Sequence, residues 1–242
     1  MRFVVRMAVR ELRASWRRMV FFFVCVAVGV GTIVALRSVI QGVGVAMTAE
    51  TRALTAADVI IVSEQPWSAE ALAIIDETLA DEPIISSTKS TEMMTMARPL
   101  DESKAVAKVV ELRGVEAAFP FYGAFELEGS QPYRHDLLLN GGALVRPELL
   151  TQLGVEVGDK IVIGNGTFEI RGVITREPGG QLGAFSFGPR VLIDRGHLVS
   201  AGLLQFGTRA ERQVLVRVPE ERIETLVGLL RTRLTDEVVR VR

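Results

Sequence analysis

The chain has 242 residues, a formal net charge of −1 and one cysteine, Cys25. Six arginines and one glutamate give residues 1–18 a charge of +5, so the other residues together carry −6. A nucleic-acid-binding domain needs clustered basic charge on its folded part, and this acidic remainder excludes one. About 185 residues follow the first 55 or so, enough to bury a hydrophobic core without disulfide bonds.

Residues 1–18 are basic and amphipathic at helical spacing. Their apolar side, with Trp16, suits a helix that lies on the membrane surface with its arginines toward anionic headgroups. The alternative is a simple positive flank of the apolar segment that follows. In either case the excess of positive charge places this segment in the cytoplasm and the rest of the chain outside.

Residues 19–36 contain no charged side chain. A helix of this length rises about 27 Å, close to the ~30 Å of a bilayer core. Two further apolar residues can join it if Arg37 extends to the headgroups, so we predict a transmembrane helix over 19–40 in contact with membrane lipid. A cleaved signal peptide is the alternative, but its apolar run is usually shorter and Arg37 occupies the cleavage region.

Small residues recur every four positions in this segment, at Ala27, Gly31 and Ala35. Such a stripe lets a second helix approach closely, which predicts a packing face and a transmembrane partner. The alternative is chance, because Gly and Ala are common in membrane helices. Residues 41–56 keep an apolar stripe, and we expect them to form a helical stem.

The remaining residues, 57–242, alternate between strand and helix patterns. The expected strands are 58–63, 84–97, 104–112, 143–145, 190–193, 213–218 and 237–241, with a hairpin of 160–163 and 167–174. The expected helices are one capped by Ser68, one over 147–153 that ends at Gly154, one reaching Leu204, and one with Pro219 at its first position. The aromatic stretch Phe119–Phe125 either binds a ligand or packs between lobes. Together these elements predict an α+β fold: a split βαβ lobe with a β-rich lobe inserted over roughly 116–210.

Residues that could perform chemistry are few. The two histidines, His135 and His197, lie 62 positions apart without metal-ligand spacing, so we expect surface or turn residues. The glycine-rich loop with Gly179, Gly180 and Gly183 lacks the lysine of a phosphate-binding loop. No nucleophile elbow or Walker sequence occurs. We therefore predict no catalytic, cofactor-binding or metal-binding residues and no cofactor. The loop, with Gly188 and Arg190, is expected to be mobile or to contact a neighbouring domain.

Two stretches resemble a known family. The order R-E-L-R-A-S-W-R-R, apolar span, A-D-V-I-I-V-S resembles the start of FtsX-like, MacB-type ABC transporter permeases. A later pattern resembles their extracytoplasmic core domain. Its positions are filled by Leu153-Gly154, Gly158-Asp159, Gly172-Val173-Ile174, Glu177-Pro178 and Gly188-Pro189-Arg190.

This resemblance implies a non-catalytic permease subunit in the cell (inner) membrane, with a two-lobed extracytoplasmic domain. A separate ABC ATPase subunit would hydrolyse ATP and drive export or extraction of a lipid, lipoprotein or peptide. Family members continue into at least three more spans, so the end at Arg242 implies a fragment, or a partner that supplies further permease helices or a second permease copy.

Two other classes compete with this interpretation. A bitopic sensor or adaptor with an extracytoplasmic binding domain would need a cytoplasmic output module, for which eighteen residues are too few. A membrane-anchored hydrolase would need a nucleophile beside a base, and the sequence suggests none.

Overall fold

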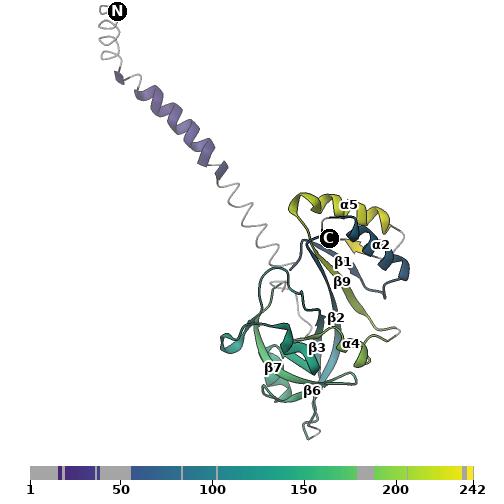
Figure 1. Cartoon of the computed structure of the whole chain (residues 1–242). Helices are drawn as coiled ribbons and strands as arrows, with labels where there is room; N and C mark the ends of the chain where they lie inside the picture. The colour runs from purple at the N-terminus through teal and green to yellow at the C-terminus, as the bar shows by residue number, and fades with distance from the viewer. Residues whose placement is uncertain are drawn as a thin grey trace, which may run out of the picture. The chain divides into compact units, whose positions relative to one another are not determined.

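The computed structural model describes residues 16–17, 20–35, 37–38, 56–82, 84–101, 103–178, 188–205, 207–235 and 239–241 (Figure 1). The chain divides into two compact units, residues 1–51 and residues 52–242. The predicted stem over 41–56 lies outside the described residues except for Ala56, and the predicted amphipathic segment over 1–18 does so except for Trp16 and Arg17.

The first unit contains a helix over 20–35 whose side chains are exposed. Inside this helix, the Thr32 hydroxyl donates a hydrogen bond to the Val28 carbonyl at 2.7 Å. None of the helices formed by the described residues combines the length and the apolar character needed to cross a membrane. The transmembrane helix over 19–40 therefore stays a prediction.

The second unit contains strands, α-helices and 3₁₀ turns. The strands are β1 Val59–Ser63, β2 Ser86–Pro99, β3 Lys108–Val115, β4 Glu126–Leu127, β5 Gly142–Val145, β6 Lys160–Ile163, β7 Gly166–Arg176, β8 Arg190–Asp194, β9 Ala210–Arg217 and β10 Arg240–Val241. The helices are α2 Ala69–Ala80, α3 Pro147–Leu153, α4 His197–Ser200 and α5 Ile223–Arg233, and the 3₁₀ turns are η1 Glu128–Ser130, η2 His135–Gly141 and η3 Glu220–Arg222.

The described strands form one sheet in the order β10-β1-β9-β2-β3-β8-β5-β7-β4, and β6 pairs with both β2 and β7. The pairs β3–β8 and β5–β7 are parallel, and the other pairs are antiparallel. The long β2 connects the two parts of the sheet, because it pairs with β9 over Ser86–Met93 and with β6 over Ala97–Pro99. The fold therefore mixes helices and strands, as predicted.

Three apolar clusters form the core. One lies among β1, β9, α2 and α5, where the two helices contact each other beside the sheet (Figure 1). A second fills the space among β2, β3, α3 and β5 to β8, and includes Phe168 and Leu149. The third contains the buried Phe119, Phe125 and Leu138. The aromatic stretch Phe119–Phe125 thus contributes core side chains.

Local signals placed several elements correctly. The Ser68 hydroxyl accepts a hydrogen bond from the Ala71 N–H at 2.8 Å and caps α2. Helix α3 ends at Gly154, whose φ of 65° is the left-handed conformation that favours glycine. Strands β6 and β7 form the expected hairpin.

Two helix predictions were wrong. The helix expected to reach Leu204 is only the single turn α4, because Gly202 adopts a φ of 67° and interrupts it. Pro219 precedes the 3₁₀ turn η3 instead of occupying the first position of a helix, and α5 begins at Ile223. The bounds of an inserted lobe at 116–210 stay a prediction.

Candidate functional site

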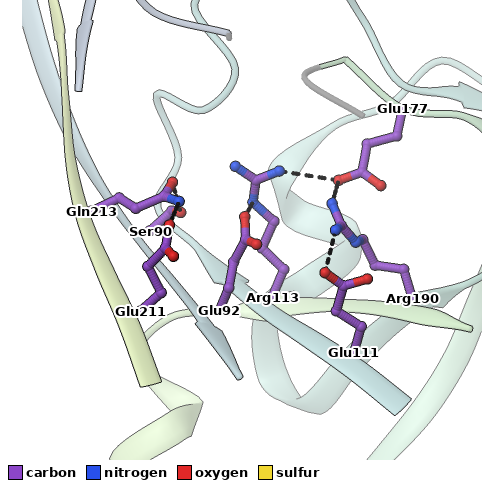
Figure 2. Close-up of polar contacts among 8 residues, drawn as sticks. All are labelled: Ser90, Glu92, Glu111, Arg113, Glu177, Arg190, Glu211 and Gln213. Atoms are coloured by element: carbon purple, nitrogen blue, oxygen red, sulfur yellow. Dashed lines mark hydrogen bonds and ion pairs between the residues drawn. The ribbon is translucent and has the colours of Figure 1, made fainter. Parts of the chain in front are cut away.

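Charged and polar side chains gather on one face of four neighbouring strands, β9, β2, β3 and β8. In the strand register, Glu92 lies opposite Arg113 on β3 and opposite Glu211 on β9. Two residues before Arg113 on β3, Glu111 lies opposite Arg190 of β8. Because side chains alternate between the two faces of a sheet, this register places all five on the same face (Figure 2).

Glu177 joins this face from the end of β7 and is the common partner of two arginines (Figure 2). Its Oε1 accepts hydrogen bonds from Arg190 Nη1 at 2.8 Å and from Arg113 Nη1 at 3.2 Å. Arg190 Nη2 also donates to Glu111 Oε1 at 2.6 Å. Arg113 Nε lies 3.0 Å from Glu92 Oε1, an ion-pair distance without a well-aligned hydrogen bond. We call these five residues the Glu177 network.

The Glu177 network is buried at its centre. The side chains of Glu177 and Arg113 are 2% and 5% exposed. Burial of a charge costs free energy unless a partner compensates it, so removing one member leaves another uncompensated. Arg113 is also stabilised by the Phe119 ring, whose centroid lies 4.4 Å from Cζ.

Arg190 keeps its charge in this setting. Burial alone would lower its pKa, but the carboxylates of Glu177, Glu92 and Glu111 outweigh that effect and raise the pKa above its ordinary value. A second polar group lies beside the network on β2 and β9. There the Ser90 hydroxyl donates to Gln213 Oε1 at 3.2 Å, and Gln213 Nε2 donates to Glu211 Oε1 at 2.8 Å.

The Glu177 network connects the two ends of one chain segment. Glu177 directly follows β7, and Arg190 is the first residue of β8. Both ends are also closely packed: a Cβ on Gly188 would lie 2.4 Å from the Val109 carbonyl oxygen, and a Cβ on Gly123 would lie 2.8 Å from Pro178 Cβ. These contacts therefore hold Pro178 and Gly188, the described residues on either side of 179–187, against the domain.

The predicted site residues fall into three groups. Ala27, Gly31 and Ala35 lie in the helix over 20–35, and a Cβ built on Gly31 would have nothing within 4 Å apart from its chain neighbours and the backbone of its own helix. Arg190 belongs to the Glu177 network, and Gly188 lies two positions before it. The predicted loop residues Gly179, Gly180 and Gly183 lie outside the described residues.

Sequence reasoning missed the Glu177 network. A usable signal was present, because Glu111 and Arg113 occupy alternate positions of a strand otherwise rich in valine. Charges at alternate strand positions indicate a polar face, but nothing local indicates that Glu177 covers it.

The two histidines are brought together by the fold. His135 Nε2 lies 2.9 Å from Asp194 Oδ2, and His197 Nδ1 lies 3.5 Å from Asp194 Oδ1. Both histidines lie in turns, η2 and α4, as expected, but their meeting at Asp194 was not predicted. Among the residues that the structure describes, no group of three or more His, Cys, Asp or Glu side chains could hold a metal ion.

Residues 20–232 match the family described as MacB-like periplasmic core domain. The chain belongs to the MacB-like periplasmic core domain family. The resemblance to MacB-type proteins noted in the sequence is thereby confirmed.

One relative of this MacB-like chain is a protein of Escherichia coli strain K12 described as the uncharacterized ABC transporter permease YbbP. The two are 26% identical over 104 residues, which are 42% of this chain and 12% of that protein. The chain thus matches only a small part of the length of its curated relative.

Two solved structures are similar to the MacB-like chain. The extracellular domain of the noncanonic ABC-type transporter YknZ from Gram-positive bacteria has a TM-score of 0.49 and 13% identity, covering 76% of this chain and 99% of that one. The periplasmic region of MacB from Actinobacillus actinomycetemcomitans has a TM-score of 0.49 and 11% identity, covering 76% of this chain and 88% of that one.

Proposed function

We propose that this chain provides the extracytoplasmic domain of an ABC transporter permease of the MacB and FtsX-like type. The observation that carries the proposal is the family match over residues 20–232, which includes both the apolar helix and the folded unit. In this proposal the helix over 19–40 anchors the chain in the cell membrane with its N-terminus in the cytoplasm. The basic residues that precede the helix support this orientation.

The chain acts in this proposal as a non-catalytic element. A separate ABC ATPase subunit hydrolyses ATP, and further permease helices or a second permease copy complete the transmembrane part. The Glu177 network suits a mechanical role, because its paired charges fix the positions of β3, β7 and β8 relative to one another. The cargo proposed is a lipid, a lipoprotein or a peptide, moved outward or extracted from the membrane.

Cysteine labelling in spheroplasts tests the orientation. In a Cys25→Ser background, Glu128→Cys puts a thiol on the exposed turn η1, and Arg6→Cys puts one in the basic segment. A membrane-impermeant maleimide is expected to label only Glu128→Cys in intact spheroplasts and both variants after lysis. Labelling of Arg6→Cys before lysis would contradict the proposed topology.

Co-purification tests the partner. The full chain, expressed together with any ATPase and permease segments encoded beside it, is expected to carry the ATPase through purification in detergent. If the domain is outside but no ATPase accompanies the chain, the permease proposal fails and a bitopic sensor or adaptor is favoured instead.

A further inference from the structure

The turn η2 is attached to the rest of the domain through the two histidines. At its end, the Gly141 N–H donates a hydrogen bond to His197 Nε2 of α4 at 2.7 Å. At its start, His135 Nε2 lies 2.9 Å from Asp194 Oδ2 at the end of β8. Two imidazole side chains thus hold the two ends of one seven-residue turn.

The geometry assigns the protons of both rings. A backbone N–H can only donate, so His197 Nε2 must be unprotonated and the ring carries its proton on Nδ1, facing Asp194. A carboxylate only accepts, so His135 carries its proton on Nε2. Its Nδ1 is buried and has no hydrogen-bond partner among the described residues. His197 is therefore neutral in this arrangement.

We propose that the contact of η2 with α4 is a proton-sensitive latch that opens when His197 takes a proton on Nε2. That proton would meet the Gly141 N–H, so an acceptor becomes a second donor at 2.7 Å and the hydrogen bond is lost. Asp194 then draws the ring away from Gly141, since its Oδ1 already lies on the Nδ1 side of the ring.

Other charged groups near the latch have partners of their own. On β7, the Arg171 guanidinium donates to the carbonyls of Leu137 and Leu139 and pairs with Glu169. On η2, Asp136 pairs with Arg134 at 2.8 Å. Beside α4, Arg195 pairs with Glu116 at 2.8 Å. The phenol of Tyr133 also lies near Asp194, and the charge of Asp194 helps to keep the phenol neutral.

Opening has a structural consequence because η2 covers part of the core. Leu138 of η2 is fully buried in the third apolar cluster, with Leu137 packed against it. The Arg171 hydrogen bonds remain, so release is expected to be local and centred on Gly141. Acidification would then loosen the end of η2 next to the buried Leu138 while the sheet stays folded.

Amide hydrogen exchange of the full chain in detergent tests the latch at pH 7.5 and pH 5.0, with rates corrected for the intrinsic effect of pH. In the wild type, protection at Gly141 is expected to fall at least tenfold on acidification, whereas protection in β3 stays constant. His197→Gln offers a carbonyl oxygen to Gly141 but cannot take up a proton. In this variant the protection of the Gly141 amide should therefore not change with pH. His135→Gln keeps the titrating acceptor and should respond like the wild type.

Two results would overturn the latch. One is pH-independent protection at Gly141 in the wild type, and the other is an equal loss of protection in His197→Gln. If His197→Gln does not fold, ¹⁵N spectra of the wild-type imidazole decide. His197 Nε2 must be unprotonated at pH 7.5, and its protonation must coincide with the loss of Gly141 protection.

Discussion

Glu177 and Arg190, 13 positions apart on either side of the glycine-rich segment, are joined by a 2.8 Å hydrogen bond from Nη1 to Oε1. Arg113 donates to the same Oε1 from the neighbouring strand β3. A buried ionic contact therefore holds Glu177 and Arg190 together. In a permease, such a joint would let the domain move as a unit.

Replacing Glu177 by glutamine keeps its size but removes the charge between Arg113 and Arg190. Because Arg113 is buried, we expect the free energy of unfolding to fall by about 2–4 kcal/mol. Chemical unfolding followed by circular dichroism measures this change. Glu126→Gln is the matched control, since Glu126 and Arg176 form an exposed pair whose loss should cost less than about 1 kcal/mol. Equal effects of the two substitutions would show that burial of the Glu177 network does not increase the cost of removing Glu177.

Two Gly→Ala substitutions should change stability in opposite directions. At Gly188 the added Cβ would lie 2.4 Å from the Val109 carbonyl oxygen, and backbone on both sides must shift. We expect a loss of about 1–3 kcal/mol. At Gly228, inside α5, an added Cβ would have nothing within 4 Å apart from its chain neighbours and the backbone of the helix itself, so alanine should add about 0.5–1 kcal/mol. Thermal unfolding of both variants tests this, and a stable Gly188→Ala would contradict the close packing.

The raised pKa of Tyr133 predicts that the free energy of unfolding falls at alkaline pH. Burial, with a smaller contribution from Asp194, raises the pKa of its phenol to about 12. The folded chain thus keeps this proton at a pH where the unfolded chain loses it. Stability from this group is complete below pH 10 and declines between pH 10 and 12, by at most about 3 kcal/mol.

Tyr133→Phe checks this assignment. The buried hydroxyl has no hydrogen-bond partner among the described residues, so its removal should be neutral or slightly stabilising at pH 8. As the pH rises from 10 to 12, the free energy of unfolding, measured in urea, should then fall more in the wild type than in the variant. In Tyr122→Phe, absorbance at 295 nm should still rise near pH 12, because Tyr133 is then the chain's remaining tyrosine. Titration near pH 10 in that variant would disprove the raised pKa.

The small-residue stripe in the apolar helix gives a prediction about assembly, which rests on the proposed function. Gly31→Leu should leave membrane insertion intact, measured by carbonate extraction, but weaken association with the permease helices about tenfold, or roughly 1.4 kcal/mol. Gly29→Leu makes the same chemical change on the opposite side of the helix and should have little effect. If both variants assemble as well as the wild type, the stripe is not a packing face.

Much of the local structure could be predicted from sequence, because its causes are local. Ser68 caps α2 through a bond to a residue three positions away, and Gly154 ends α3 through its own left-handed backbone. The prediction for α4 failed because apolar spacing favoured a helix up to Leu204. The positive φ of Gly202 depends instead on a segment of the same chain that packs beside it.

The sequence alone determined the order of basic segment, apolar segment and mixed domain, together with membership of the MacB-like family. Periodicity, caps and motif order suffice for these, since each depends on residues close in the chain. Only the tertiary structure decided that Glu177 neutralises Arg113, and that His135 and His197 share Asp194. The contacts of Glu177 with Arg113 and of Asp194 with His135 join residues 64 and 59 positions apart. Sheet pairing decides which charges meet and which are buried, and no local pattern encodes that choice.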